Sequence, residues 1–101
     1  MTRNQVGNLL MVCNYPSDTA YAWWLMEHFW KILAERFSQD GNSAYLAFPE
    51  ITSISETIAT APIEPVVLSI PWRSREGASK VRNFLREKKI SLVYFTDQPY
   101  F

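Results

Sequence analysis

Asn8-Leu9-Leu10-Met11-Val12-Cys13 is apolar at every position after the first, and the segment 14–19 that follows it is rich in turn-forming residues. A short apolar run with such a boundary is typical of a strand buried on both faces of a parallel sheet. Pro16 cannot continue the strand, and each residue of Ser17-Asp18-Thr19 carries an oxygen that can cap a helix. The stretch therefore predicts a strand over 8–13 and a helix that begins near Asp18.

The following residues have the period of an amphipathic helix. Spacings of three, four and seven relate the apolar residues of one face, which are Met26, Phe29, Trp30, Leu33 and Phe37. Glu27, Lys31 and Glu35 share another face. Gly41 follows the last periodic residue and can adopt the left-handed conformation that ends many helices. The pattern predicts a helix from about residue 18 to the turn at 40–42.

The rest of the chain repeats this alternation of strands and helices. Apolar runs predict strands over 43–48, 65–70 and 91–96, and the polar segment 50–62 reads as a loop with one helical turn at 55–59. A second helix is expected over 74–88, capped by Ser74. Its apolar face is formed by Ala78, Val81 and Leu85, with Phe84 beside them.

This alternation predicts an α/β fold. Short turns between strands and helices imply right-handed crossovers, so the four strands should form a Rossmann-like parallel sheet with helices on both faces. The expected strand order is three, two, one, four, because a doubly wound sheet reverses its winding next to the first strand. The last strand is expected to lead into a further helix, so the domain is expected to be incomplete within 101 residues.

Composition and charge exclude several function classes. Ten Lys and Arg residues balance ten Asp and Glu residues, which gives no overall bias toward nucleic acid or a membrane surface. The single Cys13 cannot form an internal disulfide, which favours a reducing, cytoplasmic location. The apolar run 9–13 is too short for a signal peptide core or a transmembrane segment.

Motifs for bound cofactors are absent from the sequence. The three glycines, Gly7, Gly41 and Gly77, leave the turn after the first strand without the GxGxxG or P-loop pattern that cradles phosphates. One histidine and one cysteine without metal-ligand spacing give no metal site, so no cofactor is expected. We interpret Cys13 as a buried strand residue and His28 as a partly exposed structural residue.

Two surface features keep a different class of function open. Seven of the ten basic residues lie between Arg73 and Lys89, where they can track a phosphate backbone or simply form a solvated helix face. Trp23, Trp24 and Trp30 on one helix can form a sugar or partner platform, although core packing is the simpler interpretation. The alternative is therefore a stand-alone α/β module that binds proteins or nucleic acid.

Two segments carry a resemblance to a known family. Leu10-Met11-Val12-Cys13-Asn14-Tyr15-Pro16, followed by a helix that ends in Ala34-Glu35-Arg36-Phe37, resembles the start of a family 4 glycosyltransferase. The segment 84–97, with the letters FLREKKISLVYFTD, resembles the helix-then-strand segment of the same domain. Together these segments extend the resemblance over nearly the whole chain.

The resemblance implies a two-domain GT-B enzyme that moves a sugar from a nucleotide sugar to an acceptor. Retention of anomeric configuration and independence from a bound metal are implied as well. This chain would form part of the acceptor-side domain and would be inactive alone, because the C-terminal donor-binding domain is missing from it. Its implied partners are the nucleotide sugar and the acceptor, with no nucleic acid.

One departure from the family pattern limits what the first turn is expected to bind. The family commonly has a glycine pair in the turn after the first strand, where this chain has Ser17-Asp18-Thr19-Ala20. Direct contact of this loop with donor phosphates is therefore not implied. A helix N-terminus with free N–H groups can nevertheless face an anion.

The candidate site follows from the expected strand order. The turn 14–19 and the segment 97–99 should lie side by side at the carboxyl edge of the sheet, where ligands bind in doubly wound folds. Asp97 is the candidate catalytic residue. The candidate substrate-binding residues are Asn14, Tyr15, Ser17, Asp18, Thr19 and Gln98. A purely structural role stays open, in which Asp18 only caps its helix and Asp97 only begins a turn.

Overall fold

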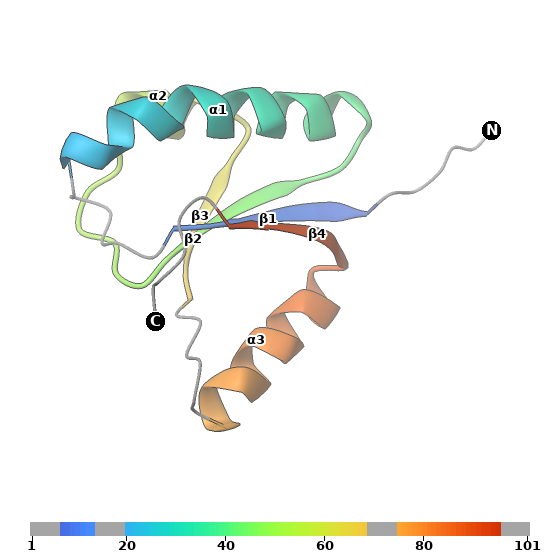
Figure 1. Ribbon diagram of the computed structural model, residues 1–101. Helices are drawn as coiled ribbons and strands as arrows, with labels where there is room; N and C mark the ends of the chain where they lie inside the picture. Colours follow the sequence, from blue (N-terminus) through green and yellow to red (C-terminus); the bar gives the residue numbers. More distant parts are fainter. Residues whose placement is uncertain (1–6, 14–19, 69–74, 96–101) are drawn as a thin grey trace.

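The structure is a computed structural model that describes residues 7–13, 20–68 and 75–95. In chain order, its elements are β1 (Asn8–Val12), α1 (Ala20–Gln39), β2 (Ala44–Phe48), α2 (Glu56–Thr60), β3 (Glu64–Val67), α3 (Arg75–Glu87) and β4 (Ile90–Phe95). Figure 1 shows the strands as one layer between helices. The predicted alternation of strands and helices is therefore confirmed.

The four strands form one open, parallel sheet in the order β3-β2-β1-β4. β1 lies between β2 and β4, with Leu10 opposite Tyr45 on one side and Val93 on the other. β3 pairs with β2 over its whole length. The expected Rossmann-like α/β sheet and its strand order are confirmed.

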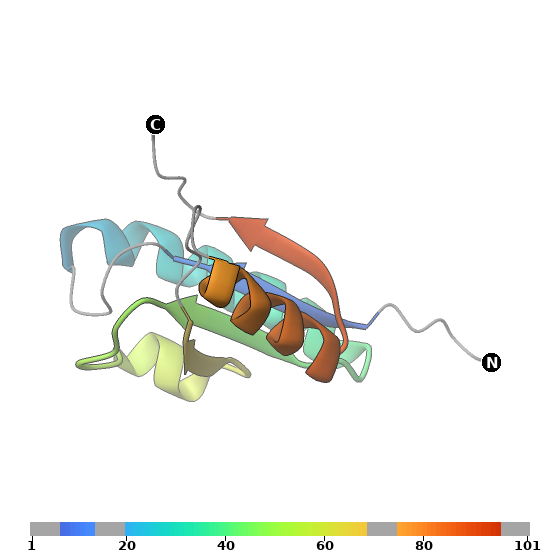
Figure 2. The ribbon, with the colours of Figure 1, turned by 90° about the horizontal axis from the view of Figure 1, so that it is seen from below.

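The helices cover both faces of the sheet. α1 and α2 lie on one face, and α3 lies on the other (Figures 1 and 2). This division follows from right-handed crossovers, because the chain moves one way along the sheet from β1 to β3 and the opposite way from β3 to β4. The winding thus reverses between β1 and β4.

The face under α1 and α2 holds the larger hydrophobic cluster. Its fully buried members include Leu9, Met11, Leu46, Trp30 and Phe48. The Trp30 and Phe48 rings meet edge to face, with centroids 6.4 Å apart and an interplanar angle of 81°, an arrangement that aromatic pairs prefer. Cys13 and Trp30 are both buried here, which confirms the packing predicted for these two residues.

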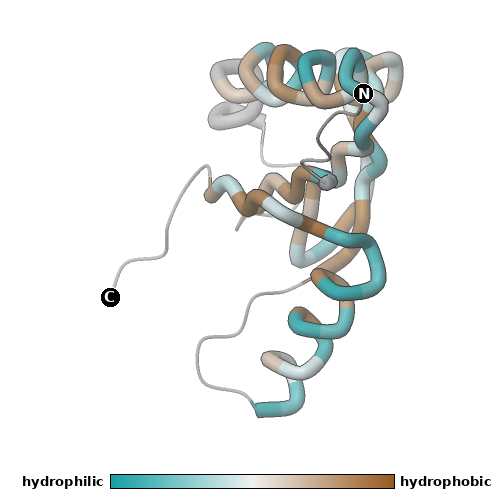
Figure 3. Tube along the Cα trace, turned by 90° about the vertical axis from the view of Figure 1, so that its right-hand side faces the viewer, coloured by the Kyte–Doolittle hydropathy of each residue, from teal (hydrophilic) through white to brown (hydrophobic). Residues whose placement is uncertain are grey.

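The face under α3 is more thinly covered. Phe84 and Leu85 pack against a cluster centred on Leu10, Val12 and Tyr45, and the Phe84 and Tyr45 rings lie 5.6 Å apart, edge to face. No residue of α3 itself is buried. Figure 3 shows hydrophilic colours along most of this helix. The contacts with the sheet are concentrated at its C-terminal half.

This arrangement corrects one sequence prediction. Ala78 was expected on the packed face of the second long helix, but it is exposed, whereas Val81 and Leu85 of the same predicted face are half-buried. The helix runs at a steep angle to the sheet, and its first turns lie farther from the strands than its last turn (Figure 1). Helical period identifies the residues that share a face, but it does not give the angle at which the helix packs.

The C-terminal end of α1 and the N-terminal end of α2 lie where the sequence predicts them. Gly41 has φ +84°, and its N–H donates to the carbonyl of Ser38 while the Asn42 N–H donates to Phe37. These two bonds form a Schellman motif. The helical turn expected within 50–62 is α2, and the Ser55 hydroxyl accepts a hydrogen bond from the Ile58 N–H as its N-cap.

Other boundaries differ by one or a few residues. β3 begins at Glu64, one residue before the predicted start, because Glu64 already pairs with Tyr45. β4 begins at Ile90 for the same reason, since Ile90 pairs with Asn8. The predicted caps Asp18 and Ser74, and the predicted end of the third strand, lie outside the described residues.

Asn8 connects three elements through its side chain. Its Nδ2 donates to the carbonyl of Lys88 at 2.7 Å, and its Oδ1 accepts from the Ser43 N–H at 2.8 Å. Lys88 follows α3 and Ser43 precedes β2, so one amide group joins the start of β1 to both neighbouring connections. This role has no signature in the local sequence, where Asn8 only begins an apolar run.

We expect Asn8→Ala to lower the free energy of unfolding by about 2 kcal/mol, because two hydrogen bonds of about 1 kcal/mol each are lost. Asn83→Ala is the matched control, since Asn83 is exposed on α3 and should change stability by no more than about 0.5 kcal/mol. Urea unfolding followed by circular dichroism measures both. Equal effects of the two substitutions would show that the Asn8 amide does not hold these elements together.

Candidate functional site

The place where the sheet reverses its winding is at the carboxyl ends of β1 and β4. Val12 of β1 and Phe95 of β4 are register partners, so these two strands end side by side. α1 follows β1 on one face of the sheet, and α3 precedes β4 on the other (Figure 2). In open α/β sheets, ligands bind outside the carboxyl ends of the strands at such a reversal.

The candidate residues themselves lie outside the described part of the chain. They are Asn14, Tyr15, Ser17, Asp18, Thr19, Asp97 and Gln98. Their expected adjacency stays a prediction. The strand pairing on which it depends is confirmed, because β1 pairs with β4 and not with β3.

The residues that end β1 and β4, just before the candidate residues, are apolar and lie at least partly in the core. Val12 and Cys13 are buried, and Phe95 is half-buried in the cluster beneath α3. The Cys13 N–H donates to the carbonyl of Ala47, which extends the pairing of β1 and β2 by one residue. Buried, hydrogen-bonded backbone of this kind gives a fixed support from which polar loop residues can project.

Histidine and cysteine, which are common metal ligands, each occur once in the sequence, as His28 and Cys13. Within 7–13, 20–68 and 75–95, no group of three His, Cys, Asp or Glu side chains is arranged to hold a metal ion. His28, which was expected to be partly exposed, is exposed on α1.

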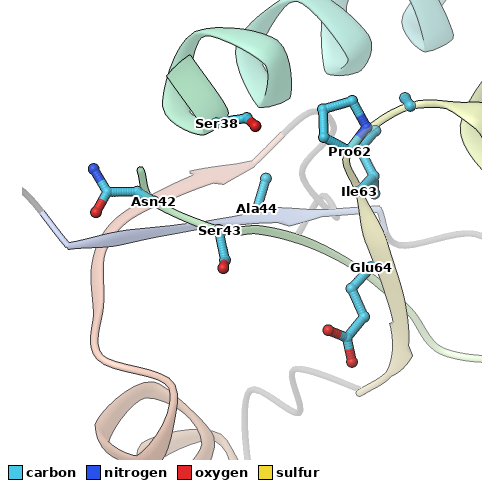
Figure 4. A pocket seen from close by; sticks show the side chains of 8 residues that line it. Ser38, Asn42, Ser43, Ala44, Pro62, Ile63 and Glu64 are labelled. Carbon is cyan, nitrogen blue, oxygen red and sulfur yellow. The ribbon is translucent and has the colours of Figure 1, made fainter. Parts of the chain in front are cut away.

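A pocket of about 320 Å³ is present at the other end of the sheet. Figure 4 shows it between the end of α1 and the starts of β2 and β3. Its lining residues are Ser38, Asn42, Ser43, Ala44, Ala61, Pro62, Ile63 and Glu64. Its lining combines hydroxyl and amide groups with apolar side chains, and Glu64 is the one charged residue among those that line it.

No local sequence pattern indicates this pocket, because its wall forms only when residues 38–44 and 61–64 approach one another in space. The pocket lies at the amino ends of the strands, opposite the winding reversal. It therefore contributes nothing to the candidate site at the carboxyl ends.

The basic segment has the properties of a solvated helix face. Arg75, Lys80, Arg82 and Arg86 are all exposed on α3, together with the acidic Glu76 and Glu87. Lys88 places its ammonium group 5.8 Å from the centre of the Tyr45 ring, within the range of a cation–π contact. Part of the positive charge thus supports the packing of α3 on the sheet.

No protein family, curated protein or solved structure matches this chain. Among the helices in the described ranges, none has the length and apolar character required to cross a bilayer.

Proposed function

We propose that this chain forms the acceptor-side, Rossmann-like part of a GT-B glycosyltransferase that transfers a sugar from a nucleotide sugar to an acceptor. The observation that carries the proposal is the reversal of winding between β1 and β4. Such a reversal is the usual ligand site of a doubly wound sheet. The resemblance of segments 10–37 and 84–97 to family 4 glycosyltransferases supplies the reaction class.

In this proposal, the polar residues after β1 and β4 meet the acceptor. Asn14, Tyr15, Ser17, Asp18 and Thr19 bind and orient it from one side, and Gln98 does so from the other. Asp97 is the catalytic candidate, since a carboxylate at this edge can accept a proton from an attacking hydroxyl. The donor nucleotide binds mainly to a second domain, so this chain alone should not turn over a nucleotide sugar.

Binding to the isolated chain tests this proposal directly. We expect a panel of short oligosaccharide acceptors to shift the amide NMR signals of Val12, Cys13 and Phe95, which flank the carboxyl ends of β1 and β4. UDP-glucose and GDP-mannose should bind more weakly and should not be hydrolysed. Asp97→Ala should weaken acceptor binding about tenfold, by loss of a hydrogen bond to a charged group.

Glu87→Ala is the matched control, because Glu87 is an exposed carboxylate at the end of α3. It should leave binding unchanged. Signals that move only at Ser43 and Glu64 would assign ligand binding to the pocket at the amino ends of the strands and would contradict the proposal. Turnover of a nucleotide sugar by the isolated chain would contradict the need for a second domain.

A further inference from the structure

The outer side of α3 carries three aligned arginines. Arg75, Arg82 and Arg86 are all exposed. Seven and eleven positions separate Arg82 and Arg86 from Arg75, so at about 3.6 residues per turn all three lie within about 20° of one line along the helix. Phe84, which packs edge to face on the Tyr45 ring, lies on the opposite side of the helix from Arg75. The three arginines, which we call the arginine stripe, therefore face away from the sheet over a length of about 16 Å.

No acidic side chain neutralises the arginine stripe within the ranges that the structure describes. Residues three or four positions apart are neighbours on a helix surface, and at those distances from the stripe α3 has no Asp or Glu. Its two acidic residues, Glu76 and Glu87, lie about 80° or more around the helix from every member of the stripe. α1 and α2 cover the opposite face of the sheet (Figure 1), so neither of those helices covers the arginines.

The stability of α3 does not account for this alignment. Arg75 is the first residue of the helix, where the positive end of the helix dipole disfavours a cation. Arg82 and Arg86 are four positions apart, and like charges at that distance repel each other. The dipole favours only Arg86, which lies in the last turn. An anionic partner would remove both unfavourable effects.

We propose that the arginine stripe binds an acidic segment of a partner protein. Each guanidinium group can donate two parallel hydrogen bonds to one carboxylate, a geometry that a lysine ammonium does not offer. Successive arginines are about 10 and 6 Å apart along the helix, so a short segment with several Asp or Glu residues can reach all three. This inference does not depend on the proposed transferase function.

Two other anionic partners fit the surface less well. Nucleic acid binds mainly through an extended positive field, whereas this chain has a formal net charge of zero and the stripe spans only about two turns beyond its first arginine. A bilayer surface takes up helices that present a large apolar face. The large apolar residues of α3 are instead turned toward the sheet, where Phe84 and Leu85 pack.

Fluorescence anisotropy with a labelled octaglutamate peptide tests the inference on the whole chain. We expect a dissociation constant on the order of 100 µM at about 50 mM salt, weakened at least about tenfold at about 300 mM salt by screening. Arg82→Gln with Arg86→Gln should weaken binding at least about tenfold at low salt, because two of the three guanidinium groups are lost. Amide NMR signals of Ser79 and Asn83, which lie beside the stripe on α3, should move on binding.

Arg36→Gln with Lys80→Gln is the matched control, because it removes the same amount of charge from exposed positions outside the stripe. It should change binding by no more than about twofold, and circular dichroism should show native helix content in both double variants. Equal effects of the two double variants, or NMR shifts confined to other elements, would overturn the inference. Tighter binding of an eight-nucleotide oligothymidylate, or of phosphatidylserine vesicles, than of the peptide would overturn the choice of an acidic protein segment.

Discussion

Replacing Trp30 with alanine is expected to lower the free energy of unfolding by about 3–5 kcal/mol. The Trp30 side chain is 1% exposed and is the largest fully buried side chain of the described residues. It packs on Phe48 of β2, within the cluster that joins α1 to the sheet. A domain of this size is stable by only about 5–15 kcal/mol in total, so the variant should be partly unfolded near room temperature.

Phe29→Ala is the control for this substitution, because it removes an aromatic ring from the adjacent residue, which is 40% exposed. Its cost should be near 1 kcal/mol, from lost contact with Tyr94. Thermal and urea unfolding measure both. If Phe29→Ala were the more damaging change, α1 would contact the sheet through a different face from the one described.

Replacing Gly7 with alanine should lower the free energy of unfolding by about 2–4 kcal/mol. Gly7 has φ +89°, and an added Cβ would lie 2.9 Å from the Ser91 hydroxyl oxygen and 3.1 Å from the Lys89 carbonyl oxygen. Positive φ alone costs an alanine about 1–2 kcal/mol. The close approach to the backbone of Lys89 adds to this cost, because that carbonyl accepts a hydrogen bond from the Asn8 N–H and cannot move freely.

Gly41→Ala separates the cost of positive φ from the cost of the steric contact. Gly41 has a similar φ of +84°, but an added Cβ would meet nothing within 4 Å. Its substitution should therefore cost only the conformational part, about 1–2 kcal/mol. Urea unfolding curves of the two variants compare them directly. Equal losses would mean that the space beside Gly7 can relax without cost.

Most of the fold could be predicted from the sequence because it depends on local patterns. Apolar runs bounded by turn residues located the strands, and the right-handed crossover rule converted their alternation with helices into the order β3-β2-β1-β4. Gly41 marked the end of the first helix through its own backbone chemistry. These features involve residues close together in the chain.

Features that depend on distant residues could not be predicted in this way. Asn8 bonds to groups 35 and 80 positions away, and nothing around Asn8 identifies them. The exposure of Ala78 depends on the tilt of a whole helix. The candidate site was predicted from a general rule for doubly wound sheets, and that rule supplies its location but not the arrangement of Asn14 or Asp97.

The central position of β1 has a consequence for how the chain folds. β1 is the first strand in the sequence, yet one of its two neighbours is β4, and Asn8 bonds to Lys88, which is 80 residues later. Closing a loop of that length costs about 4 kcal/mol of chain entropy before any contact compensates for it. Pairings with such high sequence separation slow folding. During synthesis, β1 can pair with β2 early, but its other edge has to wait until β4 has emerged from the ribosome.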